Sequence, residues 1–243
     1  MRKTIGIAAA TAVLFTSAAV AVGAGPTDDF DRPDIVGTDA ADTLTGSVGS
    51  ERIFALAGND TVNGNPGSDW LDGGRGEDAL DGSSGNDLLT GETCNAEVCD
   101  PPETDVLRGG SGADRIESNR CRTDVTPQEC PDGRANDRLY GADGDDDLIL
   151  NAPGRTLADG GPGNDDIDGS AGNDQLVGGT GRDDIDGDRG NDTINALDRN
   201  IDDVNCGPGR DSVRADKNDR LSNCEQVTPK RKTKKDKKGA DKG

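Results

Sequence analysis

Aspartate recurs every nine residues along much of the chain, with a glycine two residues before it and an aliphatic residue two residues after it. The stretch GGRGEDALDGSSGNDLLTG, residues 73–91, holds two copies, Gly76-x-Asp78-x-Leu80 and Gly85-x-Asp87-x-Leu89. Carboxylates are oxygen donors for hard cations, and glycine turns expose backbone carbonyls that add further oxygens. The residues that could do chemistry are therefore candidate ligands of a metal ion.

The period persists over roughly residues 37–215, but it is interrupted after residue 91. Asp87 and Asp105 are two periods apart, so we expect the segment with Cys94 and Cys99 to take the place of one repeat. Asp114 to Asp137 is two periods plus five residues.

Those five extra residues fit a loop around Cys121 and Cys130, which makes Asp137-x-Leu139 a weaker repeat. A second clean block follows, and a short phase slip around residues 198–203 precedes a last copy at Asp211.

A fixed period of nine residues predicts one small structural unit per repeat, stacked on its neighbours. The glycines form a tight turn, and the remaining residues form a very short strand whose single aliphatic side chain points inward. Two units make a coil of about 18 residues, and successive coils stack as parallel strands about 4.8 Å apart. The sequence thus predicts an all-β parallel β-roll with two short sheets around a strip of Leu, Ile and Val.

Stacking places each aspartate close to the aspartate 18 residues away, where the two carboxylates would repel. A divalent cation with six to eight oxygen ligands removes this repulsion. Magnesium requires a smaller octahedral shell and keeps its waters, so calcium fits carbonyl-rich turns better.

The nonapeptides GGRGEDALD, GNPGSDWLD, GGPGNDDID and GGTGRDDID resemble the RTX, or haemolysin-type, calcium-binding repeat. The resemblance covers most of the chain and implies a right-handed parallel β-roll that binds several calcium ions between successive turns. The implied aspartate ligands are Asp60, Asp69, Asp78, Asp87, Asp114, Asp146, Asp165, Asp174, Asp183 and Asp192. The glycines implied to offer carbonyls or to shape the turns are Gly58, Gly67, Gly76, Gly163, Gly172 and Gly181.

An EF-hand is the competing metal site, and residues 184–195 place acidic residues at its first, third and fifth positions. The match fails because Arg189 stands where the loop needs glycine and Asn195 where it needs glutamate.

Composition limits the function classes. Hydrophobic residues make up 30% of the 243 residues and aromatic residues 2%, which is too little for a conventional core. A disordered acidic chain is the alternative that such a composition leaves open. The net charge is −21, and residues 4–229 alone carry −29, so a nucleic-acid partner is excluded and cations are favoured.

The chain has no histidine, which excludes a Ser-His-Asp triad and histidine-ligated zinc catalysis. Paired aspartates could serve a glycosidase or a calcium-assisted lyase, but each one singled out already has a place in the repeat. We therefore predict that the protein is not an enzyme.

The N-terminus, MRKTIGIAAATAVLFTSAAVAVGAG, has two basic residues, an apolar run and small residues before a polar segment. This order is typical of a secretory signal peptide. Cleavage could follow Ala21 or Ala24, and we favour Ala24; an uncleaved anchor is the alternative, although the run is short for a bilayer span. We expect a secreted, extracellular protein with no membrane span in its mature chain.

Six cysteines in an exported chain predict three disulfides. Proximity in sequence favours the sequential pairs Cys94–Cys99, Cys121–Cys130 and Cys206–Cys224 among the fifteen pairings that are possible. A cysteine zinc site is the alternative, but the chain has no Cys-x-x-Cys.

These features divide the chain into seven segments. They are a signal peptide (1–24), a linker (25–36), a first repeat block (37–91), interrupted repeats with cysteine loops (92–136), a second block (137–200), a disulfide-closed cap (201–228) and a basic disordered tail (229–243).

The basic tail contrasts with the acidic body, and it either binds anionic cell-envelope polymers or polysaccharide, or is merely solvated. In the former case the roll would act in adhesion or surface display. We expect a monomer. Trp70 should point outward beside Leu71 and cover a sheet face, with carbohydrate stacking as the alternative, and Tyr140 should pack similarly.

Overall fold

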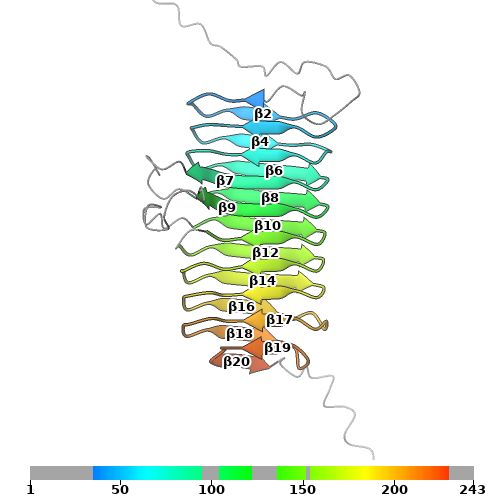
Figure 1. Cartoon of the computed structure of the whole chain (residues 1–243), viewed down its shortest axis with the longest axis vertical. Helices are drawn as coiled ribbons and strands as arrows, with labels where there is room; N and C mark the ends of the chain where they lie inside the picture. Colours follow the sequence, from blue (N-terminus) through cyan, green and yellow to red (C-terminus); the bar gives the residue numbers. More distant parts are fainter. Residues whose placement is uncertain (1–34, 95–103, 122–135, 152–153, 230–243) are drawn as a thin grey trace, which may run out of the picture.

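The computed structural model describes residues 35–94, 104–121, 136–151 and 154–229, and its regular structure there is entirely strand. Twenty short strands form two parallel ten-stranded sheets, and successive strands alternate between the sheets (Figure 1). Sheet A contains β1 (Ile35–Val36), β3 (Arg52–Phe54), β5 (Trp70–Asp72), β7 (Leu88–Cys94), β9 (Arg115–Cys121), β11 (Asp147–Ile149), β13 (Asp166–Asp168), β15 (Asp184–Asp186), β17 (Asp203–Asn205) and β19 (Arg220–Ser222). Sheet B contains β2 (Thr43–Thr45), β4 (Thr61–Asn63), β6 (Ala79–Ser84), β8 (Val106–Ser111), β10 (Arg138–Asp143), β12 (Leu157–Pro162), β14 (Gln175–Thr180), β16 (Thr193–Ala196), β18 (Ser212–Ala215) and β20 (Gln226–Pro229).

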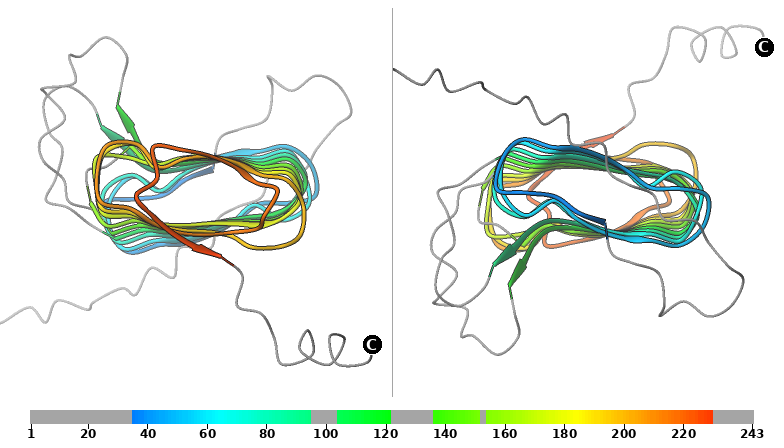
Figure 2. Two further views of the ribbon diagram at one scale, coloured as in Figure 1. Left: turned by 90° about the horizontal axis from the view of Figure 1, so that it is seen from below. Right: turned by 90° about the horizontal axis from the view of Figure 1, so that it is seen from above.

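Each coil of the chain passes once through each sheet. Ile53 pairs with Leu71, and Leu71 pairs with Leu89, so register partners in these regular coils are 18 residues apart. Seen along its long axis, the stack is a flattened oval with one sheet on each broad side (Figure 2). The predicted all-β parallel roll with coils of about 18 residues is confirmed.

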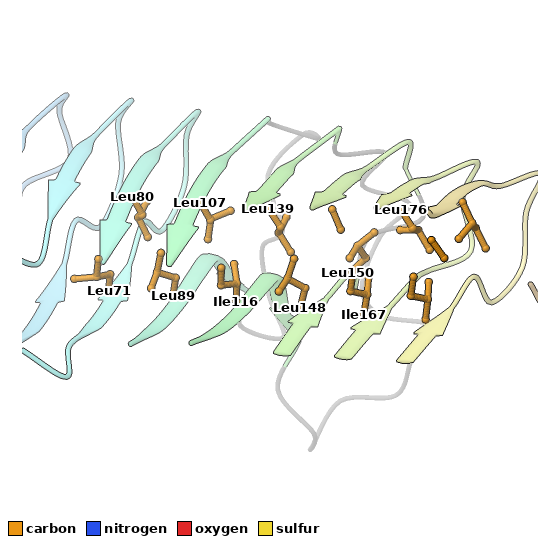
Figure 3. Packing of buried hydrophobic residues seen from close by; sticks show 14 of the residues in the cluster. Leu71, Leu80, Leu89, Leu107, Ile116, Leu139, Leu148, Leu150, Ile167 and Leu176 are labelled. Atoms are coloured by element: carbon orange, nitrogen blue, oxygen red, sulfur yellow. The ribbon is translucent and has the colours of Figure 1, made fainter. Parts of the chain in front are cut away.

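The core is a strip of aliphatic side chains between the two sheets. Because side chains alternate along a strand, a three-residue strand sends its middle side chain inward and its neighbours outward. Strand after strand contributes one such residue, and the two rows face each other in Figure 3. The fully buried members include Ile53, Leu71, Leu80, Leu89, Leu107, Ile116, Leu139, Leu148, Ile167, Leu176, Ile185 and Ile194.

The segment with Cys94 and Cys99 does not replace a repeat, and that prediction was wrong. Leu80 pairs directly with Leu107, and Leu89 pairs with Ile116, so the two coils on either side of residues 95–103 are immediate neighbours. The segment is an insertion within one turn. Its length hid this, because an insertion close to a whole period leaves the phase of the repeat unchanged.

The second interruption is also an insertion, and the stack continues across it. Leu107 pairs with Leu139 and Ile116 pairs with Leu148. The phase slip near residues 198–203 likewise hides a strand, since β17 brings Val204 into register with Ile185. Both sheets therefore run without a break from β1 and β2 to β19 and β20.

Glycine is required at the turns because adjacent coils approach too closely for a side chain. We number the nonapeptide so that its aspartate is position 6; the predicted turn glycines then occupy position 4. A Cβ added to Gly76 would lie 1.8 Å from the carbonyl oxygen of Gly58, and one added to Gly181 would lie 1.4 Å from that of Gly163. No side chain fits at either separation.

The predicted disulfide Cys206–Cys224 is confirmed, with a Cα–Cα distance of 5.2 Å. It joins two successive coils at the C-terminal end. Cys94 and Cys121 are register partners at the ends of β7 and β9. Cys99 and Cys130 lie outside the described residues, so the pairings Cys94–Cys99 and Cys121–Cys130 stay predictions.

The aromatic residues that the structure describes, Phe54, Trp70 and Tyr140, lie on the outer faces of the sheets. Trp70 packs edge-on against Phe54 on sheet A, with ring centroids 5.4 Å apart. Arg108 lies over the ring of Tyr140 on sheet B at 5.3 Å. Within the described ranges no helix is long and apolar enough to cross a bilayer. The predicted signal peptide and nearly all of the predicted basic tail fall outside these ranges.

Replacing Ala142 with glycine should stabilise the roll. Ala142 has φ of 77°, in the left-handed region where an ordinary residue costs about 1–3 kcal/mol. Glycine adopts this conformation without that cost. We expect Ala142→Gly to raise the free energy of unfolding by about 1 kcal/mol, measured by urea denaturation at a fixed ion concentration.

The matched control is Ala158→Gly, the same substitution at a buried position of β12. This variant should be less stable than the wild type because it loses a core methyl group in a strand. Equal losses of unfolding free energy in Ala142→Gly and Ala158→Gly would contradict backbone strain at Ala142.

Candidate metal centre

The residues at position 6 form two ladders, one along each narrow edge of the roll. Ladder 1 precedes the sheet B strands and ladder 2 precedes the sheet A strands. Ladder 1 comprises Asp42, Asp60, Asp78, Asp105, Asp137, Thr156, Asp174, Asp192, Asp211 and Glu225. Ladder 2 comprises Glu51, Asp69, Asp87, Asp114, Asp146, Asp165, Asp183, Asp202 and Asp219.

One carboxylate oxygen of each aspartate holds the next coil in place. The main-chain N–H of Asp69 donates to Oδ1 of Asp87 at 2.7 Å, and that of Asp87 donates to Oδ1 of Asp114 at 2.8 Å. The same bond recurs from coil to coil along both ladders, including Asp192 to Asp211 at 2.9 Å in ladder 1. Hydrogen bonds to an ionised acceptor are stronger than neutral ones, so Oδ1 contributes to stacking.

The second oxygen, Oδ2, is buried, and in many turns it accepts no hydrogen bond from any residue that the structure describes. A buried carboxylate oxygen without a partner costs free energy, so its presence in turn after turn indicates a missing ligand. The aspartates in this state are Asp60, Asp87, Asp114, Asp137, Asp146, Asp165, Asp183, Asp192, Asp202 and Asp211.

Where position 1 of the turn is glycine, Oδ2 faces the bare Cα of that glycine. A Cβ added to Gly82 would lie 2.4 Å from Oδ2 of Asp87 and 2.6 Å from the carbonyl oxygen of Gly109, in the next coil. At Gly141 the corresponding distances are 2.3 Å to Asp146 and 2.5 Å to a carbonyl. A carboxylate oxygen and a glycine carbonyl therefore face one small volume, and both are ligand types that calcium prefers.

Side chains alone do not complete such a site. Within the described part of the chain, no group of three or more His, Cys, Asp or Glu residues is gathered in a way that could hold a metal ion. Each ladder is a single line of carboxylates, so an ion between two turns needs backbone carbonyls in its shell. The donor set fits a hard cation that accepts mixed oxygen ligands.

Burial raises the pKa of many ladder aspartates. The pKa of Asp165 rises to about 7, first because burial disfavours the charged form and then because Asp183 and Asp146 repel it. The pKa of Asp105 rises to about 9 for the same reasons, with Asp137 and Asp78 as neighbours. The N–H donors to Oδ1 oppose these shifts without cancelling them.

Arginines neutralise carboxylates on the outer face of sheet A. Arg115 pairs with Asp147 and with Glu117, and Asp203 pairs with both Arg182 and Arg220. These ion pairs are at least partly exposed, so each contributes little. None of these four ion pairs involves a ladder residue.

All ten predicted aspartate ligands occupy position 6 and belong to the ladders. The six predicted glycines are at position 4, where they allow turns to stack. Sequence reasoning missed the position 1 glycines that face Oδ2, although the first glycine of GGRGEDALD marks this position. Six aspartates of the ladders were not among the predicted ligands, although three of them, Asp105, Asp137 and Asp211, had been assigned to repeats. The six are Asp42, Asp105, Asp137, Asp202, Asp211 and Asp219.

The metal-free chain should lose stability as the pH rises from about 5 to 8. In this range the folded chain keeps protons on groups such as Asp165, with its pKa of about 7, whereas unfolded aspartates with a pKa of about 3.9 have lost theirs. Stability falls with pH wherever the folded state binds more protons. Urea denaturation in the presence of a chelator, at several pH values, measures this slope.

Asp165→Asn provides the control. Its amide oxygen can still accept the N–H of Asp146, but the group no longer titrates, so the slope should be shallower than in the wild type. A free energy of unfolding that rises with pH across this range would contradict the buried, protonated ladder.

A family model for the RTX calcium-binding nonapeptide repeat, described as four copies, matches residues 34–62, 55–89, 103–120, 132–152 and 159–194. The matched ranges cover more than half of the chain and include turns of both ladders. Among curated proteins, none matches the sequence.

Proposed function

Since the chain belongs to the RTX calcium-binding nonapeptide repeat family, we propose that its ladder turns bind several calcium ions and that this binding orders the roll. A repeat of this family in a β-solenoid fits a calcium-binding repeat protein. The observation that carries the proposal is the row of buried Oδ2 atoms that face a position 1 glycine.

The ligands in this proposal are those predicted aspartates whose Oδ2 faces a glycine at position 1, together with carbonyl oxygens of the glycine turns. Asp114, Asp146 and Asp165 would each offer Oδ2 to an ion while Oδ1 keeps its main-chain hydrogen bond. Calcium coordinates six to eight oxygens in flexible geometry, which suits carboxylates and carbonyls on stacked turns. Magnesium, with its strict octahedral shell, suits them less well.

Ordering by calcium follows from the weak core. Each nonapeptide buries about one aliphatic side chain, worth about 1.5–3 kcal/mol, while ordering each residue of backbone costs about 1–2 kcal/mol. Residues 4–229 also carry a net charge of −29, which opposes compaction. Binding of several divalent cations would offset both costs, so metal binding and folding are coupled.

The place of action in this proposal is outside the cell. A signal-like N-terminus and the oxidised pair Cys206–Cys224 support export. Extracellular calcium modules have dissociation constants of about 10⁻⁴–10⁻³ M. The chain would thus remain loose in a cytoplasm that is poor in calcium and order after export.

The function that we propose is structural and not enzymatic, because the RTX roll is a calcium-binding domain and not a catalytic one. A second candidate role is adhesion or surface display, with the loaded roll as a spacer. It is favoured by the eight basic residues in residues 230–243, against two acidic ones, beside an acidic body. Such a segment would bind anionic envelope polymers or polysaccharide.

Calcium titration of the oxidised chain tests the proposal. Starting in chelator at neutral pH, we expect a cooperative increase in β-sheet circular dichroism with calcium at submillimolar to millimolar concentrations. The fluorescence of Trp70 should change in the same transition, because its ring packs on Phe54 only when β3 and β5 are paired. Equal concentrations of magnesium should have a much smaller effect.

The variant Asp87→Asn/Asp146→Asn separates metal binding from stacking. Asparagine keeps an oxygen that can accept the N–H bonds from Asp69 and Asp114, but it removes both charges. The transition should move to higher calcium concentration. Identical responses to calcium and magnesium, or no response of the wild type to calcium, would refute the calcium-dependent roll.

A further inference from the structure

The two edges of the roll differ in a way that the regular repeat conceals. Ladder 2 turns begin with glycine from Gly64 to Gly178, and only its last two turns begin with alanine, at Ala196 and Ala215. In ladder 1, turns that begin with a residue that has a side chain are spread along the described part of the stack. The exceptions in ladder 1 are Ala55, Ser118, Leu150 and Cys206, and all four side chains are buried. A side chain at position 1 occupies the volume that Oδ2 faces in the glycine turns.

In ladder 2 this volume is open in six successive turns. A Cβ added at position 1 would lie only 2.2–2.6 Å from Oδ2 of the aspartate of the same turn. The glycines with this geometry are Gly64, Gly82, Gly109, Gly141, Gly160 and Gly178. The backbone is equally uniform, because position 2 has positive φ in all six turns, at Asn65, Ser83, Gly110, Ala142, Gly161 and Gly179.

In ladder 1 the volume is filled at intervals. Ala55 stands at position 1 of the Asp60 turn and is fully buried. Ser118 and Cys206 take the same place in the Asp137 and Asp211 turns. Oδ2 of Asp60 has no hydrogen-bond partner among the described residues, and neither has Oδ2 of Asp87 or Asp165 in ladder 2, so the carboxylate alone does not distinguish the turns. The side chain at position 1 distinguishes the turns of the two ladders.

The turn from Leu150 to Thr156 lacks both elements of the site. Leu150 replaces the glycine, is 2% exposed and lies among the core side chains (Figure 3). Thr156 replaces the aspartate, yet its main-chain N–H still donates to Oδ1 of Asp174 at 2.8 Å. Leu150 therefore adds apolar burial on this edge, and Thr156 brings no charge to neutralise.

Two further contacts on this edge form without an ion. The disulfide Cys206–Cys224 links successive coils. In the next turn after Thr156 on this ladder, Oδ2 of Asp174 accepts hydrogen bonds from the N–H and hydroxyl of Ser170, both at 3.4 Å. That oxygen already has partners within the protein.

We infer that calcium binds as a continuous row along ladder 2, between Gly64 and Asp183, and that ladder 1 is interrupted at Ala55, Ser118, Leu150 and Cys206. This inference rests on the proposed calcium binding and specifies where it occurs. The interrupted edge keeps adjacent coils joined by apolar contacts and a disulfide, so part of the stack is independent of calcium.

Native mass spectrometry of the oxidised full chain, with calorimetry as a second count, measures the number of bound calcium ions. Asp87→Asn in ladder 2 should lose at least one ion and weaken binding of the remaining ions several-fold. Asp60→Asn in ladder 1, beside Ala55, should keep the wild-type number. The two variants are matched, because each keeps a side-chain oxygen for its N–H donor, Asp69 or Asp42.

Ala55→Gly and the double variant Leu150→Gly/Thr156→Asp test the converse, and each should gain one ion. The Ala55→Gly variant and the Leu150→Gly/Thr156→Asp variant both remove buried methyl groups, which could lower their stability. If these variants do not fold, the number of ions bound by Asp60→Asn and Asp87→Asn decides the question. Equal losses in Asp60→Asn and Asp87→Asn would overturn the inference while leaving calcium binding intact. A wild-type chain that binds no calcium would overturn the proposed function as well.

Discussion

The structure depends on how each ladder carboxylate divides its two oxygens. Oδ1 accepts the main-chain N–H of the preceding coil, as Asp114 does from Asp87, and thereby fixes the stacking distance. That bond also orients the group, so Oδ2 must point into the turn, where a side chain at position 1 would collide with it. A residue that builds the stack thus creates an unsatisfied charge at every step.

This division explains why the repulsion between neighbouring ladder carboxylates arises in the folded state. Parallel stacking sets neighbouring coils about 4.8 Å apart, so carboxylates approach each other in line and away from water. Asp165 lies between Asp146 and Asp183, and each of them raises its pKa. Either a proton or a cation can neutralise such a row, and the two compete. Calcium affinity should therefore be coupled to pH through the same oxygens.

Much of the fold could be predicted from the sequence, because period, side-chain alternation and strand spacing are local rules. The inward aliphatic residues, the coil length and the pair Cys206–Cys224 all follow from spacing. The insertions could not be predicted from spacing, since an inserted segment near one period in length, such as residues 95–103, has the same length as a repeat. Position 1 was missed because its importance arises from a contact with Oδ2, which no spacing reveals.

Departures from the consensus carry the information that the repeat itself does not. In a solenoid each coil contacts only its neighbours, so stability is a sum of interface terms along the stack. On the proposed calcium binding, the term between two coils would vary with calcium where Gly and Asp are kept, and apolar burial would fix it where Leu150 and Thr156 stand. An uninterrupted row would couple each site to the next through shared turns, which would favour cooperative loading. An interrupted row on the opposite edge would limit how far the chain unfolds when the ion is withdrawn.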